Sequence, residues 1–172
     1  MLAWGKAIET ASDKKIQVLD IGGGFFPEDL QTEIQAKIYQ LRKKTAQALP
    51  GLEEIILEPG KALTQLAMGL ATQVLEIRRS VTGSIEVVVD GSIAELPDIW
   101  HYPHRIVWIQ PEGRWELLNQ TGTSRILGRL CMEGDILAEN ISIPEEIRKG
   151  DILIFLDTGS YDRSMSYDFG RG

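Results

Sequence analysis

Three consecutive glycines, Gly22, Gly23 and Gly24, follow the apolar stretch Ile16–Ile21, which we expect to be a buried strand. A glycine run between a strand and a helix leaves backbone N–H groups bare, so a phosphate group could bind there. The spacing is not that of the dinucleotide fingerprint, because the third glycine of that motif is absent. Taken alone, the run is more typical of a tight turn that needs positive φ.

A second candidate begins at Glu58, which follows the short apolar strand expected at Glu54–Leu57 and precedes Gly60 and Lys61. Alone, this segment is equally compatible with a plain corner that has solvated side chains. Glu58 lies 36 positions after Gly22, close to the roughly 31 residues of one βα unit in an eight-fold barrel. We therefore expect both segments at one sheet edge, on neighbouring strands. A phosphate site beside a carboxylate suits a phosphorylated heterocycle that can be protonated, such as pyridoxal phosphate.

Two further segments carry reactive or polar side chains. Residues 128–137 hold the single cysteine, Cys131, which in isolation would be interpreted as a small buried apolar residue. Residues 157–170 follow an apolar stretch and hold several hydroxyls, including that of Tyr161, which could bind an anion or simply form a polar surface loop.

The elements that must position these residues differ between the two halves of the chain. Helix formers fill residues 28–49 and 62–79. In the first part of the chain, up to residue 82, we therefore expect helices that connect parallel strands. After residue 82 the pattern predicts an antiparallel barrel or sandwich. The fold class is thus α/β followed by all-β, with domains at residues 1–82 and 83–172. The short strands expected in the second domain are Ile85–Val89, Arg105–Ile109, Trp115–Asn119, Arg125–Leu130, Asp135–Ile141 and Asp151–Leu156.

Composition narrows the functional classes. The 172 residues carry a formal net charge of −7, which disfavours binding to nucleic acid or to anionic lipid. No apolar stretch is long enough to span a bilayer, and one cysteine fits a reducing cytoplasm. The chain is too short for a complete eight-fold βα barrel, which needs about 250 residues.

In this order, the four segments resemble the fold-type III pyridoxal-phosphate decarboxylases, which act on ornithine, diaminopimelate, arginine or carboxynorspermidine. The family patterns are L-D-hydrophobic-G-G-G-F, E-P-G-R, G-x-x-C-x-x-x-D-x-L and G-A-Y-x-x-S-M-S. The resemblance implies the last two βα units of an alanine-racemase-like barrel plus a C-terminal β-domain. It also implies a lyase of amino-acid metabolism or polyamine biosynthesis, with pyridoxal 5'-phosphate as cofactor and an amino acid as substrate.

The resemblance assigns the cofactor to the first domain and to Tyr161. The glycine run would donate N–H groups to the phosphate, Glu58 would pair with the ring nitrogen, and Tyr161 would contact the phosphate. Lys61, after Gly60, replaces the family's phosphate-binding arginine, so the charge remains but the bidentate fork does not. The cofactor-binding residues expected are Gly22, Gly23, Gly24, Glu58, Gly60, Lys61 and Tyr161.

The resemblance also assigns catalytic and substrate contacts. Cys131 would reach across a homodimer interface and govern protonation of the product. Met132 stands where the family has an acidic residue that reads the substrate's distal amine, and His101 stands where it has an aspartate. Asp135 completes the cysteine motif and is expected to bind substrate. His101 and His104 alone are too few for a metal site and are interpreted as surface or packed residues.

The family's Schiff-base lysine and ring-stacking histidine have no counterpart before Gly22, since Lys6, Lys14 and Lys15 lie outside that lysine's sequence context. We therefore expect a decarboxylase portion that is inactive alone and is completed by a complementary N-terminal barrel half. The alternative is a non-catalytic module that binds or regulates a full-length homologue. A racemase of the same fold fits less well, because the Cys131 and Tyr161 segments follow the decarboxylase patterns.

Overall fold

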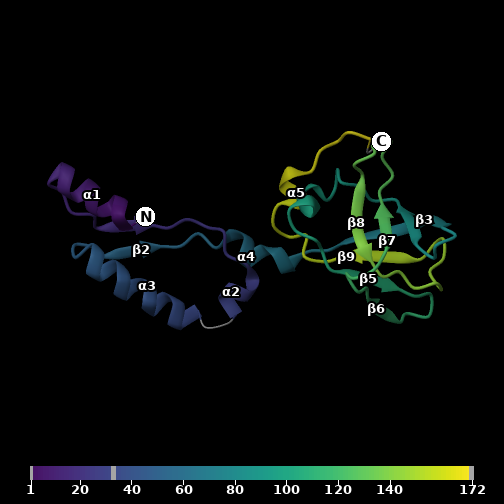
Figure 1. Ribbon diagram of the computed structural model, residues 1–172, viewed down its shortest axis with the longest axis horizontal. Helices are drawn as coiled ribbons and strands as arrows, with labels where there is room; N and C mark the ends of the chain where they lie inside the picture. The colour runs from purple at the N-terminus through teal and green to yellow at the C-terminus, as the bar shows by residue number, and fades with distance from the viewer. Residues whose placement is uncertain (1, 32–33, 171–172) are drawn as a thin grey trace. The chain divides into compact units, whose positions relative to one another are not determined.

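A computed structural model describes residues 2–31 and 34–170 (Figure 1). The chain divides into two compact units, Met1–Leu63 and Thr64–Gly172. This division falls earlier than the boundary expected after residue 82, which lies in the turn between two paired strands of the second unit.

The first unit contains a pair of short parallel strands. β1 (Val18–Asp20) pairs in register with β2 (Glu54–Ile56). The connection between them contains α2 (Pro27–Gln31) and α3 (Ile34–Ala48), and α1 (Leu2–Ser12) precedes β1. Both expected strands and their parallel pairing are confirmed, although each strand is shorter than predicted. The burial expected for the first strand is wrong, since Val18 of β1 is 50% exposed. The predicted helix over 28–49 corresponds to α2 and α3, and residues 32 and 33 of that prediction lie outside the described residues.

The helix expected over 62–79 is wrong. The chain forms α4 (Gly60–Thr64) and a 3-10 turn (Gln65–Ala67), and then the long strand β3 (Leu70–Arg79). β3 lies between two strands, β9 and β4, and pairs antiparallel with both. Gly69 allows the backbones to approach, since a Cβ there would lie 3.1 Å from the Phe155 carbonyl oxygen. The first unit therefore has two parallel strands but lacks the second long helix of the predicted pair of βα units.

The second unit is a seven-stranded sheet with the order β6-β5-β9-β3-β4-β7-β8. Its neighbouring strands are antiparallel except for β4 and β7, which are parallel. All six predicted strands are present, and β3 is the one that was missed. Besides β3, the strands are β4 (Ile85–Val89), β5 (Ile106–Ile109), β6 (Trp115–Leu117), β7 (Ser124–Leu127), β8 (Ile136–Ile141) and β9 (Ile152–Phe155).

One hydrophobic core holds this sheet together. Residues near both edges of the sheet, Trp108 on β5 and Ile141 on β8, belong to the same buried cluster as Val74 of the central strand β3. The sheet is curled around this core rather than flat, as Figure 1 shows. Two short elements flank it, the 3-10 helix η2 (Pro97–Trp100) and α5 (Asp162–Met165).

No helix within residues 2–31 and 34–170 has the length and apolar character required to cross a membrane.

Candidate functional site

The glycine run lies directly after β1, and its conformation leaves several amides available. The Gly22 N–H donates to Asp20 Oδ1 at 2.8 Å, which forms a tight turn at the end of the strand. Gly22 and Gly24 have φ of 71° and 89°, the left-handed region that favours glycine. The N–H groups of Gly23, Gly24 and Phe25 donate to no described residue, so these amides are available as hydrogen-bond donors to an anion.

Glu58 lies beside this run. Its N–H donates to the Gly22 carbonyl oxygen at 2.8 Å, which extends the pairing of β1 and β2 beyond the strands. A Cβ on Gly23 would lie 2.7 Å from the Glu58 carbonyl oxygen, so only glycine fits there without a shift of the backbone. The expectation that both segments share one sheet edge on neighbouring strands is confirmed.

Lys61 places a positive charge near the same loop. Gly60 begins α4, and its N–H donates to the Glu58 carbonyl oxygen at 2.9 Å. Lys61 is only 7% exposed, and its Nζ lies 4.1 Å from the centroid of the Phe26 ring. Phe26, two residues after Gly24, was missed in the sequence; the available signal was an aromatic residue between a glycine run and Pro27.

These residues fit a phosphorylated, protonated heterocycle. The unpartnered amides and the Lys61 ammonium supply hydrogen-bond donors and positive charge for a phosphate dianion. The exposed Glu58 carboxylate, at the next strand end, is a suitable partner for a protonated ring nitrogen.

In the second unit, Cys131 lies at the exposed tip of the loop between β7 and β8. The base of that loop is closed by hydrogen bonds, in which the Gly128 N–H donates to the Asp135 carbonyl oxygen at 2.8 Å and the Asp135 N–H to Met132 at 3.1 Å. Arg129 holds the loop to the preceding segment, since its Nη2 donates to Glu95 Oε1 at 2.7 Å. The cysteine is therefore presented to solvent rather than packed in the core.

Asp135 lies buried beneath the loop that carries Cys131. Its side chain is buried, with the residue 3% exposed, and its oxygens accept the Ile93 N–H at 2.8 Å and the Leu130 N–H at 2.7 Å. A Cβ on Gly128 would collide with this carboxylate, which explains the glycine at that position. Asp135 therefore fixes the loop that carries Cys131, and the substrate contact expected of it stays a prediction.

The two other predicted substrate residues are accessible. Met132 is an exposed neighbour of Cys131. His101 follows η2, is exposed, and places Nδ1 3.6 Å from Asp98 Oδ1. The preceding residue, Trp100, packs on the cysteine loop, because a Cβ on Gly134 would lie 3.6 Å from its ring. His101 and the Cys131 loop therefore lie near each other in this unit.

Tyr161 is exposed directly before α5, on a segment that buried groups hold in place. Asp162 is buried and accepts the Asp98 N–H at 3.0 Å and a hydrogen bond with His104 Nε2 at 2.8 Å. His104 is buried, which agrees with the second of the two environments expected for it, surface or packed. Earlier in the segment, Gly159 donates its N–H to the Gln65 carbonyl oxygen at 3.0 Å. Sequence reasoning missed Asp162, whose position within a polar loop gives no sign of burial.

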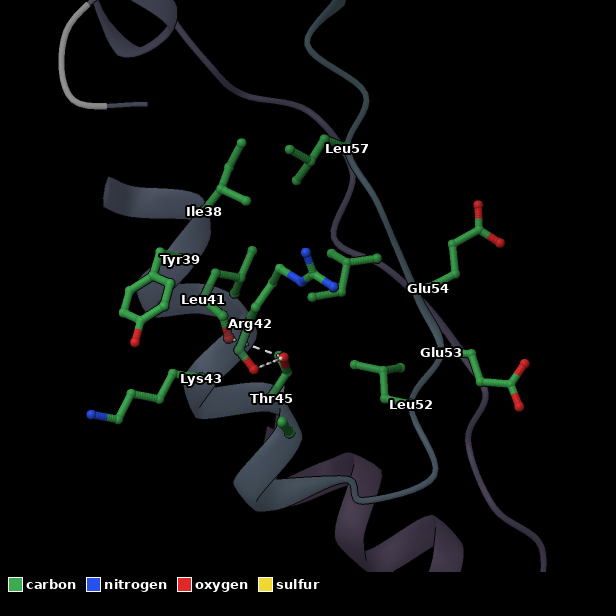
Figure 2. Close-up of a pocket in the computed structure, with 12 residues that line it drawn as sticks. Ile38, Tyr39, Leu41, Arg42, Lys43, Thr45, Leu52, Glu53, Glu54 and Leu57 are labelled. Atoms are coloured by element: carbon green, nitrogen blue, oxygen red, sulfur yellow. Dashed lines mark hydrogen bonds between the residues drawn. The ribbon is translucent and has the colours of Figure 1, made fainter. Parts of the chain in front are cut away.

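A groove of about 790 Å³ lies elsewhere in the first unit, between α3 and β2 (Figure 2). Ile38 and Leu41 project into it from the helix, and Leu52 and Leu57 project into it from the segment that contains β2, as Figure 2 shows. It contains none of the predicted site residues. Its apolar lining instead indicates a surface that another segment could cover.

Comparison with known proteins identifies the family. Residues 29–159 match the family described as the pyridoxal-dependent decarboxylase, C-terminal sheet domain. The chain belongs to this family. The family that the four segments resemble is thereby confirmed, and so is an α/β beginning followed by a curled, mostly antiparallel sheet.

The relatives of this chain are much longer than the chain itself. It is 30% identical to the diaminopimelate decarboxylase of Bacillus subtilis over 166 residues, which cover 90% of the chain and 36% of the relative. It is 27% identical to that of Actinosynnema pretiosum over 165 residues, again 90% of the chain and 36% of the relative. The chain thus spans little more than a third of these relatives.

Solved structures agree on the fold. The Paramecium bursaria Chlorella virus arginine decarboxylase bound to agmatine has a TM-score of 0.76 at 20% identity, covering 99% of this chain and 47% of that one. The diaminopimelate decarboxylase of Helicobacter pylori complexed with L-lysine has a TM-score of 0.69 at 23% identity, covering 99% and 43%.

Proposed function

We propose that this chain is the C-terminal part of a pyridoxal-phosphate-dependent amino-acid decarboxylase, made of the last strands of an alanine-racemase-like barrel and the sheet domain. The observation that carries the proposal is the run of amides at Gly23, Gly24 and Phe25 that donate to no residue in the described part of the chain, at the carboxyl edge of two parallel strands and near Lys61. The family membership supports the same cofactor.

The first unit would bind the cofactor. Gly22, Gly23 and Gly24 form the phosphate loop, in which Gly22 makes the turn and the next amides donate. Gly60 begins the short helix α4, on which Lys61 would contribute positive charge, and Glu58 would keep the ring nitrogen protonated. When bound, pyridoxal phosphate accepts the electron pair that the departing carbon dioxide leaves on the substrate.

The second unit would serve the substrate and the dimer. Cys131, exposed on a fixed loop, would enter the site of a second copy and control protonation of the product. Met132 and His101 lie near it and would contact the amino-acid substrate, while Tyr161 would contact the phosphate. Asp135 would position the Cys131 loop through the hydrogen bonds that its buried carboxylate accepts from the Ile93 and Leu130 N–H groups. A lone exposed thiol of this kind suits a reducing cytoplasm.

A complementary barrel segment would supply the lysine that binds the cofactor covalently, within the same longer protein or on a separate chain. Lys6, Lys14 and Lys15 lie outside the sequence context of the family's lysine. A two-stranded sheet is marginal alone, and parallel sheets are normally covered on both faces. The groove between α3 and β2 (Figure 2) and the exposed Ile56 of β2 are apolar surfaces for that segment to cover.

The phosphate site is tested with pyridoxine 5'-phosphate, which lacks the aldehyde and cannot react with lysines. By calorimetry, the chain should bind it more tightly than pyridoxine, and Gly23→Ala should weaken binding by more than about tenfold, because the added Cβ meets the Glu58 carbonyl. Gly134→Ala is the control, since its Cβ would meet nothing closer than 3.6 Å. Equal binding of the phosphorylated and unphosphorylated compounds would contradict the proposal.

The proposal that a complementary barrel segment supplies the lysine is tested by reconstitution from two polypeptides. The chain alone should neither develop the absorbance of lysine-bound cofactor nor release carbon dioxide. Mixed with a barrel segment of the Bacillus subtilis diaminopimelate decarboxylase that stops where the match begins, it should restore the absorbance, with the native split pair as positive control. Association without absorbance would favour the non-catalytic module instead.

A further inference from the structure

Lys61 contacts Phe26, a residue to which the family patterns assign no role. Within the first unit, the Lys61 Nζ is buried and lies 4.1 Å from the Phe26 ring centroid. An ammonium group at this distance from an aromatic face is attracted by the ring's negative face, and the attraction is strongest where water is excluded. The lysine side chain is therefore held in one place rather than sampling solvent.

The position of Phe26 is itself fixed. Its N–H donates to Asp29 Oδ2 at 2.9 Å, and its carbonyl oxygen accepts the Asp29 N–H at 3.0 Å. This reciprocal pair closes a turn at the start of α2. The hydrogen bond from Phe26 and the nearby Lys37 also lower the pKa of the Asp29 carboxyl, so it remains ionised and accepting near neutral pH.

The ring also joins the two loops of the phosphate site. Phe26 follows the last unpartnered amide, Phe25, and Lys61 follows the Glu58 turn that abuts Gly23. Phe26 is thus the residue directly after the last of these amides, and its ring carries the ammonium of a residue three positions after Glu58. A lysine lacks the rigid fork by which arginine grips a phosphate, and the ring supplies part of the fixed geometry that the lysine lacks.

We propose that Phe26 is a positioning residue for phosphate binding: its ring holds the Lys61 ammonium beside the Gly23–Phe25 amides. The inference rests on the proposed phosphate site. It predicts that phosphate affinity depends on the aromatic face at position 26, and only while the lysine is present.

The test compares full-length Phe26→Leu and Phe26→Tyr variants with the unmodified chain. NMR of the lysine side chains should detect an upfield ring-current shift of the Lys61 ε-protons in the unmodified chain and in Phe26→Tyr, but not in Phe26→Leu. Binding of pyridoxine 5'-phosphate should weaken roughly tenfold in Phe26→Leu and stay within about twofold in Phe26→Tyr. Pyridoxine itself should bind alike to all three.

A double-mutant cycle with Lys61→Met separates positioning from packing. In the Lys61→Met background, Phe26→Leu should have no further effect on phosphate binding. The same loss with and without Lys61, or no loss from Phe26→Leu at all, would overturn the inference while leaving the phosphate site intact. If the unmodified chain does not prefer pyridoxine 5'-phosphate over pyridoxine, the proposed function fails, and this inference fails with it.

Discussion

The two units of this chain differ in how much core they possess. In the second unit, side chains from the strands form one buried cluster that includes Val87, Ile126 and Phe155. In the first unit, only Leu49 and Ala62 are buried among the described hydrophobic residues, while Trp4 and Tyr39 lie exposed. The second unit has what a sheet needs to be stable, whereas the first presents apolar surface that requires a cover.

This contrast separates two kinds of functional residue. The Cys131 loop is fixed by buried hydrogen bonds inside a complete core, so its geometry belongs to this chain alone. The glycine run depends on two short strands and on local contacts between backbones. We therefore expect the stability of the chain to reside in the second unit, and the cofactor site to be the part most dependent on further polypeptide.

The largest expected effect is on the free energy of unfolding, when one hydrophobic side chain on a strand of each unit is truncated to alanine. Phe155→Ala, at a position that is 0% exposed, should lower the free energy of unfolding by about 3–5 kcal/mol. Ile56→Ala, on β2 of the first unit and 36% exposed, should cost less than about 1 kcal/mol. Urea unfolding followed by circular dichroism measures both, and equal losses would contradict the contrast.

The second prediction concerns the support of the Cys131 loop. Asp135→Ala leaves the N–H groups of Ile93 and Leu130 without their acceptor and should cost about 2–3 kcal/mol. Hydrogen exchange of the Leu130 amide should accelerate with it. Glu133→Ala, an exposed change in the same loop, is the control and should alter neither quantity. Unchanged exchange in Asp135→Ala would remove the positioning role.

A smaller effect, which depends on pH, comes from the pair of Arg105 and Asp157. Burial alone would raise the pKa of Asp157, but the hydrogen bonds and charge of Arg105 outweigh it, and the pKa falls below the ordinary value of 3.8. Because the folded-state pKa is depressed, this contribution to stability is complete above pH about 4 and is lost as the pH falls through the folded-state value.

Arg105→Gln should therefore cost about 1 kcal/mol at pH 7, and the difference from the unmodified chain should shrink on acidification below the ordinary carboxyl range. Urea unfolding at pH 7 and at pH about 3 measures this difference. Arg163→Gln removes an exposed positive charge from the same unit and serves as the control. A penalty that stays constant down to pH about 3 would rule out the carboxylate of Asp157 as its source.

The smallest effect on the free energy of unfolding should come from a substitution in the groove between α3 and β2. Ile38→Ser should change the free energy of unfolding by less than about 0.5 kcal/mol, yet weaken association with the complementary barrel segment in the reconstitution experiment. Val81→Ser, a fully exposed change in the second unit, should affect neither. Association that is unaltered by Ile38→Ser would exclude the groove as the covered surface.

The sequence predicted those elements whose patterns are local. The six strands after residue 84 alternate or run apolar between turns, and each is present. Residues 70–79 contain several good helix formers, but they pair with β9, which lies far along the chain, and a local pattern does not contain that pairing.

The same limit applies to the candidate site. The glycine run and Glu58 could be placed together, because parallel strands bring their carboxyl ends to one edge. The burial of Asp135 could not be predicted, because its motif gives its position in the sequence and only the folded loop reveals which groups surround it. Phe26 was missed because its contact is with Lys61 on α4, 35 positions further along the chain, and no local sequence pattern reveals that the two side chains meet.

One measurement addresses phosphate capture most directly: the backbone amide spectrum of the intact chain, recorded as pyridoxine 5'-phosphate is added. The largest shifts should occur at Gly23, Gly24 and Phe25, with inorganic phosphate moving the same signals at higher concentration. If those three amides stay in place while the compound binds elsewhere or not at all, this chain does not hold the cofactor's phosphate, and the decarboxylase role proposed for it loses its foundation.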